Sequence, residues 1–134
     1  MTNAGLDIVN AGAGADTITI NHAVSSINGG DTTGTSDTLV VAASSGIIDL
    51  RTATISDIQV VTVNSGSTLR ITDTQASNIT TINGAGTIEV VISGNSSVNL
   101  SNMGATTKVV TVSADSTFTG TFASGTTISV DDGA

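Results

Sequence analysis

Residues 2–19 read TNAGLDIVN followed directly by AGAGADTIT, two nine-residue units that repeat in phase. In both units a glycine is followed two residues later by Asp, and two residues after that by an aliphatic residue; the pairs are Gly5 and Gly14, Asp7 and Asp16, and Val9 and Ile18. The glycine permits a tight turn, the Asp supplies a carboxylate, and the aliphatic residue points inward. A nine-residue period of this kind predicts a parallel β-roll with cation-binding turns.

A third, stretched copy of the unit follows at residues 29–41, GGDTTGTSDTLVV. It carries an insertion of about three residues between its glycine pair and its Asp. In a roll with two nine-residue units per coil, residues about 18 apart stack on the same edge. The separation of Asp16 and Asp37 equals two units plus that insertion, so we expect them to face one another across adjacent coils.

These turn positions predict a calcium site, because calcium prefers carboxylate and carbonyl oxygens. Asp7 would lie on the opposite edge of the roll, where its stacking partner, Ser25, is not acidic. We therefore expect one or two sites and no continuous ladder of them. The predicted ligands are Asp7, Gly12, Gly14, Asp16, Gly29, Gly30, Asp31 and Asp37.

From residue 46 onward the nine-residue unit disappears, but strand signals continue. Short runs rich in β-branched residues alternate with small polar turns, and no helix is expected between them. The runs are GIIDL, IQVVTV, TLRIT, NITTI, TIEVVI, SVNL, KVVTV, TFTGTF and TTISV. Their spacing fits coils of roughly 18 to 22 residues, about six or seven coils in all, which at roughly 4.8 Å per coil make a rod on the order of 30 Å long.

Composition supports the same architecture. The chain has 134 residues, with 24 Thr, 17 Ser, 14 Val and 14 Ile against 5 Leu, which excludes a helical bundle. Its aromatic residues are two Phe, too few for the thick core of a compact β-sandwich. We predict an all-β, right-handed parallel β-solenoid: a calcium-binding β-roll over residues 1–45, continued as one rod by a Thr/Ser/Val-rich solenoid over residues 46–134.

The charge balance restricts the partners. Three Lys and Arg stand against 11 Asp and Glu, a net charge of −8, which disfavours nucleic acid and anionic membranes. No apolar run approaches the roughly 18 residues that a membrane span requires. The sequence has no Cys, and its start lacks the basic and apolar segments of a cleaved secretion signal.

The stretches GLDIVNAGAGADTITI and NGGDTTGTSDTLVV resemble the haemolysin-type calcium-binding repeats of bacterial RTX proteins. The continuation DLRTATISDIQVVTVNSGSTLRIT is similar to β-helical regions of calcium-dependent S-layer proteins and large RTX adhesins. The resemblance implies a secreted, cell-surface protein exported by type I secretion through an uncleaved C-terminal signal. No such signal is visible at DDGA, which favours a segment of a longer protein.

The sequence gives little support for a catalytic site or a phosphate-binding loop. A Ser/His/Asp triad would depend on His22, the single histidine, which we expect in a loop. Glu89 alternates within TIEVVI and is expected to point outward from its strand. The AGAGA run lacks the Lys-Ser/Thr of a phosphate loop. Asp49, Asp57, Asp73 and Asp115 are expected to cap turns or solvate the rod, and we predict that the chain is not an enzyme.

Two functional classes stay open. The first is a structural segment of a surface coat, ordered by calcium and self-associating into a lattice, with cell-surface polysaccharide as a further partner. The second is a binding module, an adhesin or a glycan- or ice-binding solenoid. For ice binding, pairs such as Thr17/Thr19 and Thr72/Thr74 would have to repeat in register on one face. A phage fibre, or a structural module attached to an enzyme, is also compatible with the sequence.

Overall fold

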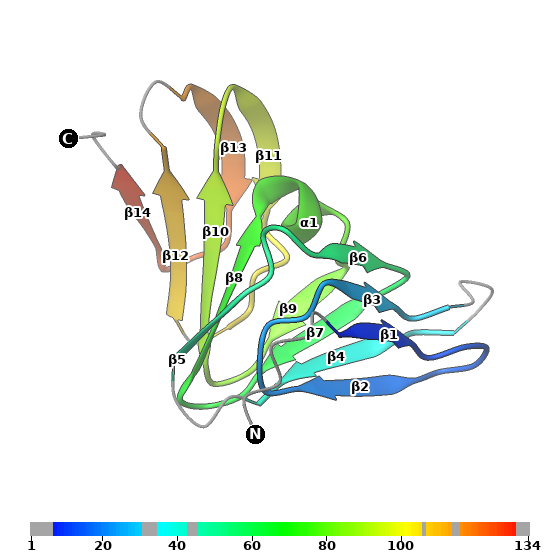
Figure 1. Ribbon diagram of the computed structural model, residues 1–134. Coiled ribbons are helices and arrows are strands. Elements are labelled where there is room, and N and C mark those ends of the chain that lie inside the picture. Colours follow the sequence, from blue (N-terminus) through cyan, green and yellow to red (C-terminus); the bar gives the residue numbers. More distant parts are fainter. Residues whose placement is uncertain (1–6, 31–34, 43–45, 106, 114–115, 131–134) are drawn as a thin grey trace.

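The computed structural model of the chain describes residues 7–30, 35–42, 46–105, 107–113 and 116–130. The chain is 54% strand and 4% helix, and its parallel sheets form a β-solenoid of about five turns (Figure 1). The predicted all-β parallel solenoid is confirmed. The expected six or seven coils are wrong, because one turn is much longer than the others and the chain fills fewer turns.

Each turn of the solenoid passes along up to three sides, which we call sides A, B and C (Figure 1). Side A holds β1 (Ile8–Asn10), β3 (Ser26–Asn28), β6 (Thr54–Ser56), β11 (Ser96–Leu100) and β13 (Phe118–Phe122). Side B holds β2 (Thr17–Ile20), β4 (Thr38–Val41), β7 (Val60–Val63) and β9 (Thr81–Asn83). Side C holds β5 (Gly46–Asp49), β8 (Ser67–Thr72), β10 (Thr87–Ile92), β12 (Thr107–Val112) and β14 (Thr126–Val130).

The strand ladders give the length of each turn. Residues paired between neighbouring strands are mostly 18 to 22 apart in sequence, from Ile8 opposite Ser26 to Thr38 opposite Val60. The exception joins β3 to β6, where Ser26 lies opposite Thr54, a markedly longer separation. Since β3 pairs with β6 and β4 with β7, the nine-residue units and the Thr/Ser/Val-rich region belong to one continuous rod.

Alternating burial explains why these short runs form strands. In β10, Ile88, Val90 and Ile92 are fully buried while the residues between them are partly exposed. Buried residues stack in columns from turn to turn, as Leu69 does on Ile88. The core is therefore thin and aliphatic, and the two Phe residues, Phe118 and Phe122, pack edge to face on β13.

One helix interrupts the strands, contrary to the expectation from sequence. Helix α1 (Asp73–Ser77) follows β8 where the preceding turn has β6, so side A divides into the sheets β1-β3-β6 and β11-β13. Its cause is a capping box: Thr72 accepts a hydrogen bond from the Gln75 N–H, and the Gln75 side chain accepts one from the Thr72 N–H. Thr72 and Thr74 consequently lie at a helix start, and not in a row on a sheet.

Two side-chain amides connect successive turns beside this helix. Gln75 Nε2 donates to the carbonyl oxygens of Leu50 and Ala53, each at 2.8 Å. Asn102 Nδ2 makes the equivalent pair of bonds one turn later, to Ala76 at 3.1 Å and Ile79 at 2.6 Å. These amides satisfy turn carbonyls that no strand reaches.

Candidate metal centre

Most of the predicted calcium ligands lie on one corner of the solenoid, where the chain passes from side A to side B. Residues 11–16 make this corner between β1 and β2, and the described residues 29–30 and 35–37 belong to it between β3 and β4. Gly12, Gly14 and Asp16 belong to the first loop. Gly29, Gly30 and Asp37 belong to the second, while Asp31 lies outside the described residues.

Asp16 and Asp37 stack directly, as their spacing in the sequence predicts. The Asp16 N–H donates to Asp37 Oδ1 at 2.8 Å, and the Thr38 N–H donates to the Asp16 carbonyl at 2.8 Å. Each Asp immediately precedes the first residue of its strand on side B, and Thr17 pairs with Thr38. Asp16 and Asp37 are therefore in register despite the insertion in the third sequence unit.

The same column continues without acids. Gln59 follows Asp37 in the next turn, and its Oε1 accepts a 2.6 Å hydrogen bond from the Asp37 N–H. Thr80 follows Gln59 and donates its N–H to the Gln59 carbonyl at 2.9 Å. The side chain of Gln59 therefore repeats the contact that Asp37 makes, with an amide in place of a carboxylate.

In each of these two Asp residues, one carboxylate oxygen is not hydrogen-bonded to any described residue. Asp16 Oδ2 and Asp37 Oδ2 are both buried without a hydrogen-bond partner in the described part of the chain. Asp37 has no solvent exposure at all. Burying a charged oxygen without a partner is unfavourable, so these two oxygens mark the corner as a candidate site for a cation.

The glycines of the second loop have little free space around them. A Cβ atom on Gly29 would lie 2.6 Å from Asp37 Oδ2 and would also clash with the carbonyl oxygen of Asp57. A Cβ on Gly30, which has a φ of 113°, would clash with the carbonyl oxygen of Gly12. Gly14, with a φ of 123°, has open space instead. The Asp57 carbonyl and the Asp37 carboxylate thus both lie close to Gly29 because this residue has no side chain.

Sequence reasoning did not associate Asp57 with this corner. Asp57 is the non-glycine residue with a positive φ, 55°, among those described. Its carbonyl oxygen faces Gly29, and the Gly29 N–H donates to the Ser56 carbonyl at 3.1 Å. The contact joins adjacent turns across the long connection from β3 to β6, and the length of that connection has no signal in the sequence.

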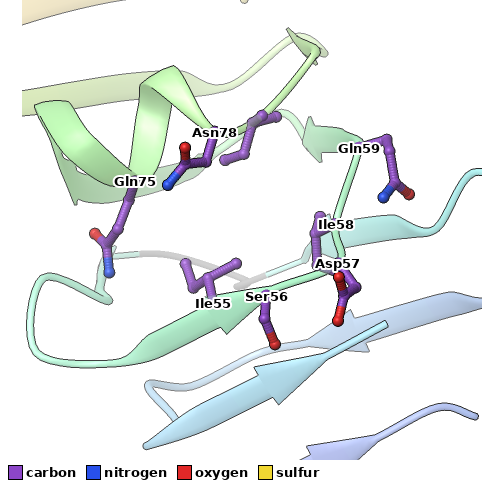
Figure 2. Close-up of a pocket in the computed structure, with 8 residues that line it drawn as sticks. Ile55, Ser56, Asp57, Ile58, Gln59, Gln75 and Asn78 are labelled. Atoms are coloured by element: carbon purple, nitrogen blue, oxygen red, sulfur yellow. The ribbon is translucent and has the colours of Figure 1, made fainter. Parts of the chain in front are cut away.

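A pocket of about 380 Å³ adjoins the corner between β6 and α1 (Figure 2). It forms where the helix replaces a strand of side A. Its lining combines aliphatic and polar side chains, namely Ile55, Ser56, Asp57, Ile58, Gln59, Gln75, Asn78 and Ile79.

Asp7 lies at the opposite edge, as predicted, and does not join the pair. Its carbonyl accepts hydrogen bonds from the N–H and the hydroxyl of Ser25, so Ser25 is its stacking partner. Its carboxylate lies 2.8 Å from His22 Nε2. His22 is exposed and makes a second contact with Asn21.

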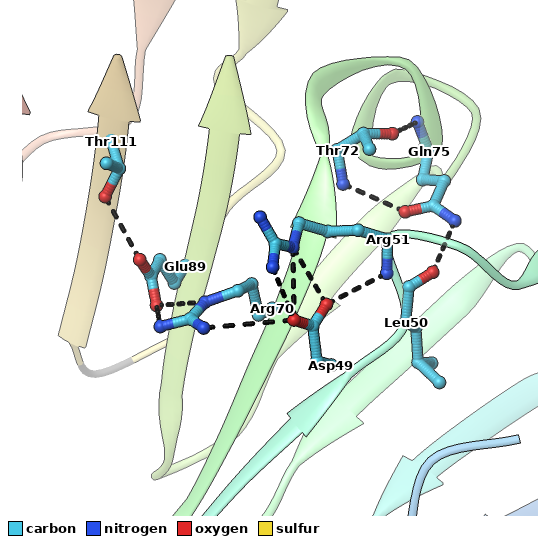
Figure 3. Close-up of polar contacts among 8 residues, drawn as sticks. All are labelled: Asp49, Leu50, Arg51, Arg70, Thr72, Gln75, Glu89 and Thr111. Carbon is cyan, nitrogen blue, oxygen red and sulfur yellow. Dashed lines mark hydrogen bonds and ion pairs between the residues drawn. The ribbon is translucent and has the colours of Figure 1, made fainter. Parts of the chain in front are cut away.

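Two of the other acids, Asp49 and Glu89, form ion pairs with arginine. Asp49 binds Arg51 at 2.7 Å, and Arg70 lies between Asp49 and Glu89, with an Arg70–Glu89 distance of 2.8 Å (Figure 3). Hydrogen bonds from Arg51 hold the pKa of Asp49 below its ordinary value of 3.8. Asp73 lies in the first turn of α1, and Asp115 is outside the described residues. Glu89 alternates with buried neighbours, as its pattern predicted.

The corner offers hard oxygen donors, the type that calcium prefers. Two carboxylate oxygens without partners lie at this corner among the described residues, whereas calcium takes roughly six to eight oxygens in all. Within the described ranges no group of three or more His, Cys, Asp or Glu side chains gathers. The described residues also contain no helix long and apolar enough to cross a membrane.

Comparison with protein-family models, with curated proteins and with solved structures returns no match.

Proposed function

We propose that the chain is a structural segment of a secreted bacterial surface protein, of the RTX or S-layer kind, whose first turns are tied together by calcium. The observation that carries this proposal is the Asp16–Asp37 pair, with one buried, unpartnered oxygen on each carboxylate. A cation bound by both carboxylates would neutralise them and join adjacent turns. The proposed role is structural and not enzymatic.

Calcium binding at Asp16 and Asp37 would also couple the folding of the chain to its export. At low calcium the two carboxylates repel one another and destabilise the corner, which keeps the first turns loose during type I secretion. Outside the cell, calcium binds the folded state and stabilises it by mass action. The rod would then self-associate into a coat or lattice, in which surface polysaccharide is a further partner.

The test is a calcium titration of the chelator-treated chain, followed by circular dichroism and thermal melting. We expect calcium to raise the melting temperature of the wild-type chain. Asp37→Asn should abolish that rise, because the amide keeps the shape but loses the charge. Asp73→Asn is the control, since it removes a carboxylate that lies on α1 and in neither of the two corner loops. Equal melting of the wild-type chain in chelator and in calcium would refute the calcium tie.

A binding module is the second candidate, favoured by the outer face of side B. The outward positions of its four strands lie in register and carry no charge, so they form a regular surface of mostly β-branched residues. The two columns are Thr17, Thr38, Val60 and Thr81, and Thr19, Val40, Thr62 and Asn83. If this face binds ice, the wild-type chain will inhibit ice recrystallisation and Thr19→Lys/Thr62→Lys will not; no inhibition by the wild-type chain excludes ice as the ligand.

A further inference from the structure

The break in side A leaves an unpaired strand edge inside the rod. Among the described residues β6 pairs with β3 alone, because α1 takes the place of a strand in the next turn. Two groups of β6 bond toward β3: the Thr54 N–H donates to the Ser25 carbonyl, and the Ser56 carbonyl accepts from the Gly29 N–H. Alternate residues of such a ladder bond to opposite neighbours, so the N–H and carbonyl of Ile55 face the gap toward α1.

Helix α1 does not close this gap. It packs mainly against β8, β10 and β11. The Gln75 amide ties its first turn to the carbonyls of the preceding turn, and the Asn102 amide ties its end to the following one. The pocket of about 380 Å³ between β6 and α1 is the space that remains (Figure 2). Because these bonds fix its walls, the pocket is preformed, as small-molecule sites usually are.

The pocket combines aliphatic surface with hydrogen-bonding groups. Ile58 and Ile79 are 4% and 3% exposed and supply apolar wall. Asn78 is exposed, and Figure 2 shows its side chain directed from the end of α1 toward β6. This amide makes no hydrogen bond to another described residue. Together with the N–H and carbonyl of Ile55, it gives the pocket both donors and acceptors.

We propose that this pocket binds one neutral sugar unit of a surface polysaccharide. Sugar hydroxyls both donate and accept hydrogen bonds, and the C–H groups of the ring can pack on aliphatic walls. The volume lies at the lower end of the roughly 300–1,000 Å³ of small-molecule sites, which suits a unit of this size.

The same lining disfavours two other ligands. Asp57 is the ionisable residue of the lining, and no described lining residue is basic, so an acidic sugar would be repelled. A peptide that added to β6 as a further strand would bond only to Ile55, since β6 has three residues.

This inference names a site for the polysaccharide partner of the proposed function and rests on that part of it, but it does not depend on calcium. The measurement is a titration of the isotope-labelled chain with glucose, galactose, mannose and N-acetylglucosamine, in chelator and in calcium, followed by amide correlation NMR spectra. We expect at least one of these sugars, at millimolar concentration, to shift the backbone amide of Ile55 and the side-chain amide of Asn78 in both buffers. Glucuronate should shift neither signal.

Asn78→Ala should weaken binding of that sugar about fivefold, the usual effect of losing one hydrogen bond, and should leave the melting temperature unchanged. Asn64→Ala is the matched control. Asn64 is also an exposed Asn whose side chain makes no hydrogen bond to a described residue, but it follows β7 and does not line the pocket. Its loss should leave sugar binding unchanged.

Four results would overturn the inference: no shift with any of the four neutral sugars, shifts confined to residues outside the pocket, equal binding of glucuronate, or unchanged affinity in Asn78→Ala. A chain that calcium stabilises but that no sugar shifts would refute the sugar site and leave the calcium tie standing. A chain that binds the sugar but melts equally in chelator and in calcium would do the reverse.

Discussion

The backbone N–H of Asp16 donates to the carboxylate of Asp37 across one full turn of the solenoid, at 2.8 Å. Oδ1 of Asp37 thus caps the preceding turn, and Oδ2 is buried without a hydrogen-bond partner among the described residues. Gln59 accepts the hydrogen bond from the Asp37 N–H in the same way, through its amide oxygen. An uncharged acceptor is therefore sufficient for the backbone contact, and the charge of Asp37 needs a separate explanation.

Removing that charge separates the two roles. In chelator, Asp37→Asn should be at least as stable as the wild-type chain, because the amide oxygen still accepts the Asp16 N–H and a buried charge disappears. In calcium the order should reverse. Urea unfolding in both buffers measures the two free energies of unfolding, and an Asn variant that is less stable in chelator would show that the carboxylate acts without a metal.

Two glycines with similar backbones test the close packing of the corner. Gly14→Ala should lower the free energy of unfolding by about 1–2 kcal/mol, because an Ala side chain disfavours a positive φ. Gly30→Ala should lower the free energy of unfolding by about 1–3 kcal/mol more than Gly14→Ala does, because its Cβ would also clash with the Gly12 carbonyl. Denaturant unfolding gives the difference, and equal losses for the two variants would contradict the packing described for Gly12 and Gly30.

The Arg70–Glu89 pair should contribute more than the Asp49–Arg51 pair. Arg70 is 28% exposed and Glu89 17% exposed, and Glu89 also accepts a 3.1 Å hydrogen bond from Thr111 (Figure 3). Arg70→Met should cost about 1–2 kcal/mol, since it leaves Glu89 partly buried without its cation. Arg51→Met, at a more exposed pair, should cost no more than about 0.5 kcal/mol. A double-mutant cycle with Glu89→Gln should give a coupling of about 1 kcal/mol, and a coupling near zero would refute the assignment.

Asp49 should titrate at a lower pH than an ordinary Asp. Its folded-state pKa lies below the value of 3.8 because Arg51 hydrogen-bonds the carboxylate, so the pair stabilises the fold above that pH. This stabilisation is lost as the pH falls through the folded-state pKa, and it is small because the pair is solvent-exposed. Carboxyl chemical shifts should show the Asp49 midpoint rising in Arg51→Met; an unchanged midpoint would remove Arg51 as the cause.

The capping box of α1 can be broken at either partner. Thr72→Ala should cost about 1 kcal/mol, the usual loss for an N-cap. Gln75→Ala should cost more, because its amide also donates to the Leu50 and Ala53 carbonyls. Thr72→Ser preserves the hydroxyl and serves as the control. Hydrogen exchange within residues 73–77 would locate the change, and a loss for Thr72→Ser as large as for Thr72→Ala would contradict the capping role.

Local patterns predicted most of the strands, and contacts between turns supplied what they missed. Alternation in TIEVVI and TLRIT marks β10 and β8 because one face of each is buried. The nine-residue phase predicted the Asp16–Asp37 contact through simple stacking. β6 was missed because its three residues are too few to establish a period. The capping box at Thr72 was readable from the sequence, but the surrounding strand pattern dominated the interpretation.

The remaining features depend on residues that are distant in sequence. Gln75 and Asn102 bind carbonyls that lie a full turn away along the chain, and no local pattern specifies that distance. Asp57 reaches Gly29 only because the turn from β3 to β6 is longer than the others. Such contacts follow from the lengths of individual turns, which small polar loops allow to vary.

The interruption at α1 also determines how the rod comes apart. Side A is broken at the helix, but β7–β9 on side B and β8–β10 on side C pair across that level without a gap. Side C begins one turn after side B, and its ladder continues to β14. The three ladders are thus interrupted at different levels along the axis, so at every level at least one ladder is continuous. Heat or mechanical tension should therefore peel turns from the ends and not divide the molecule at its helix.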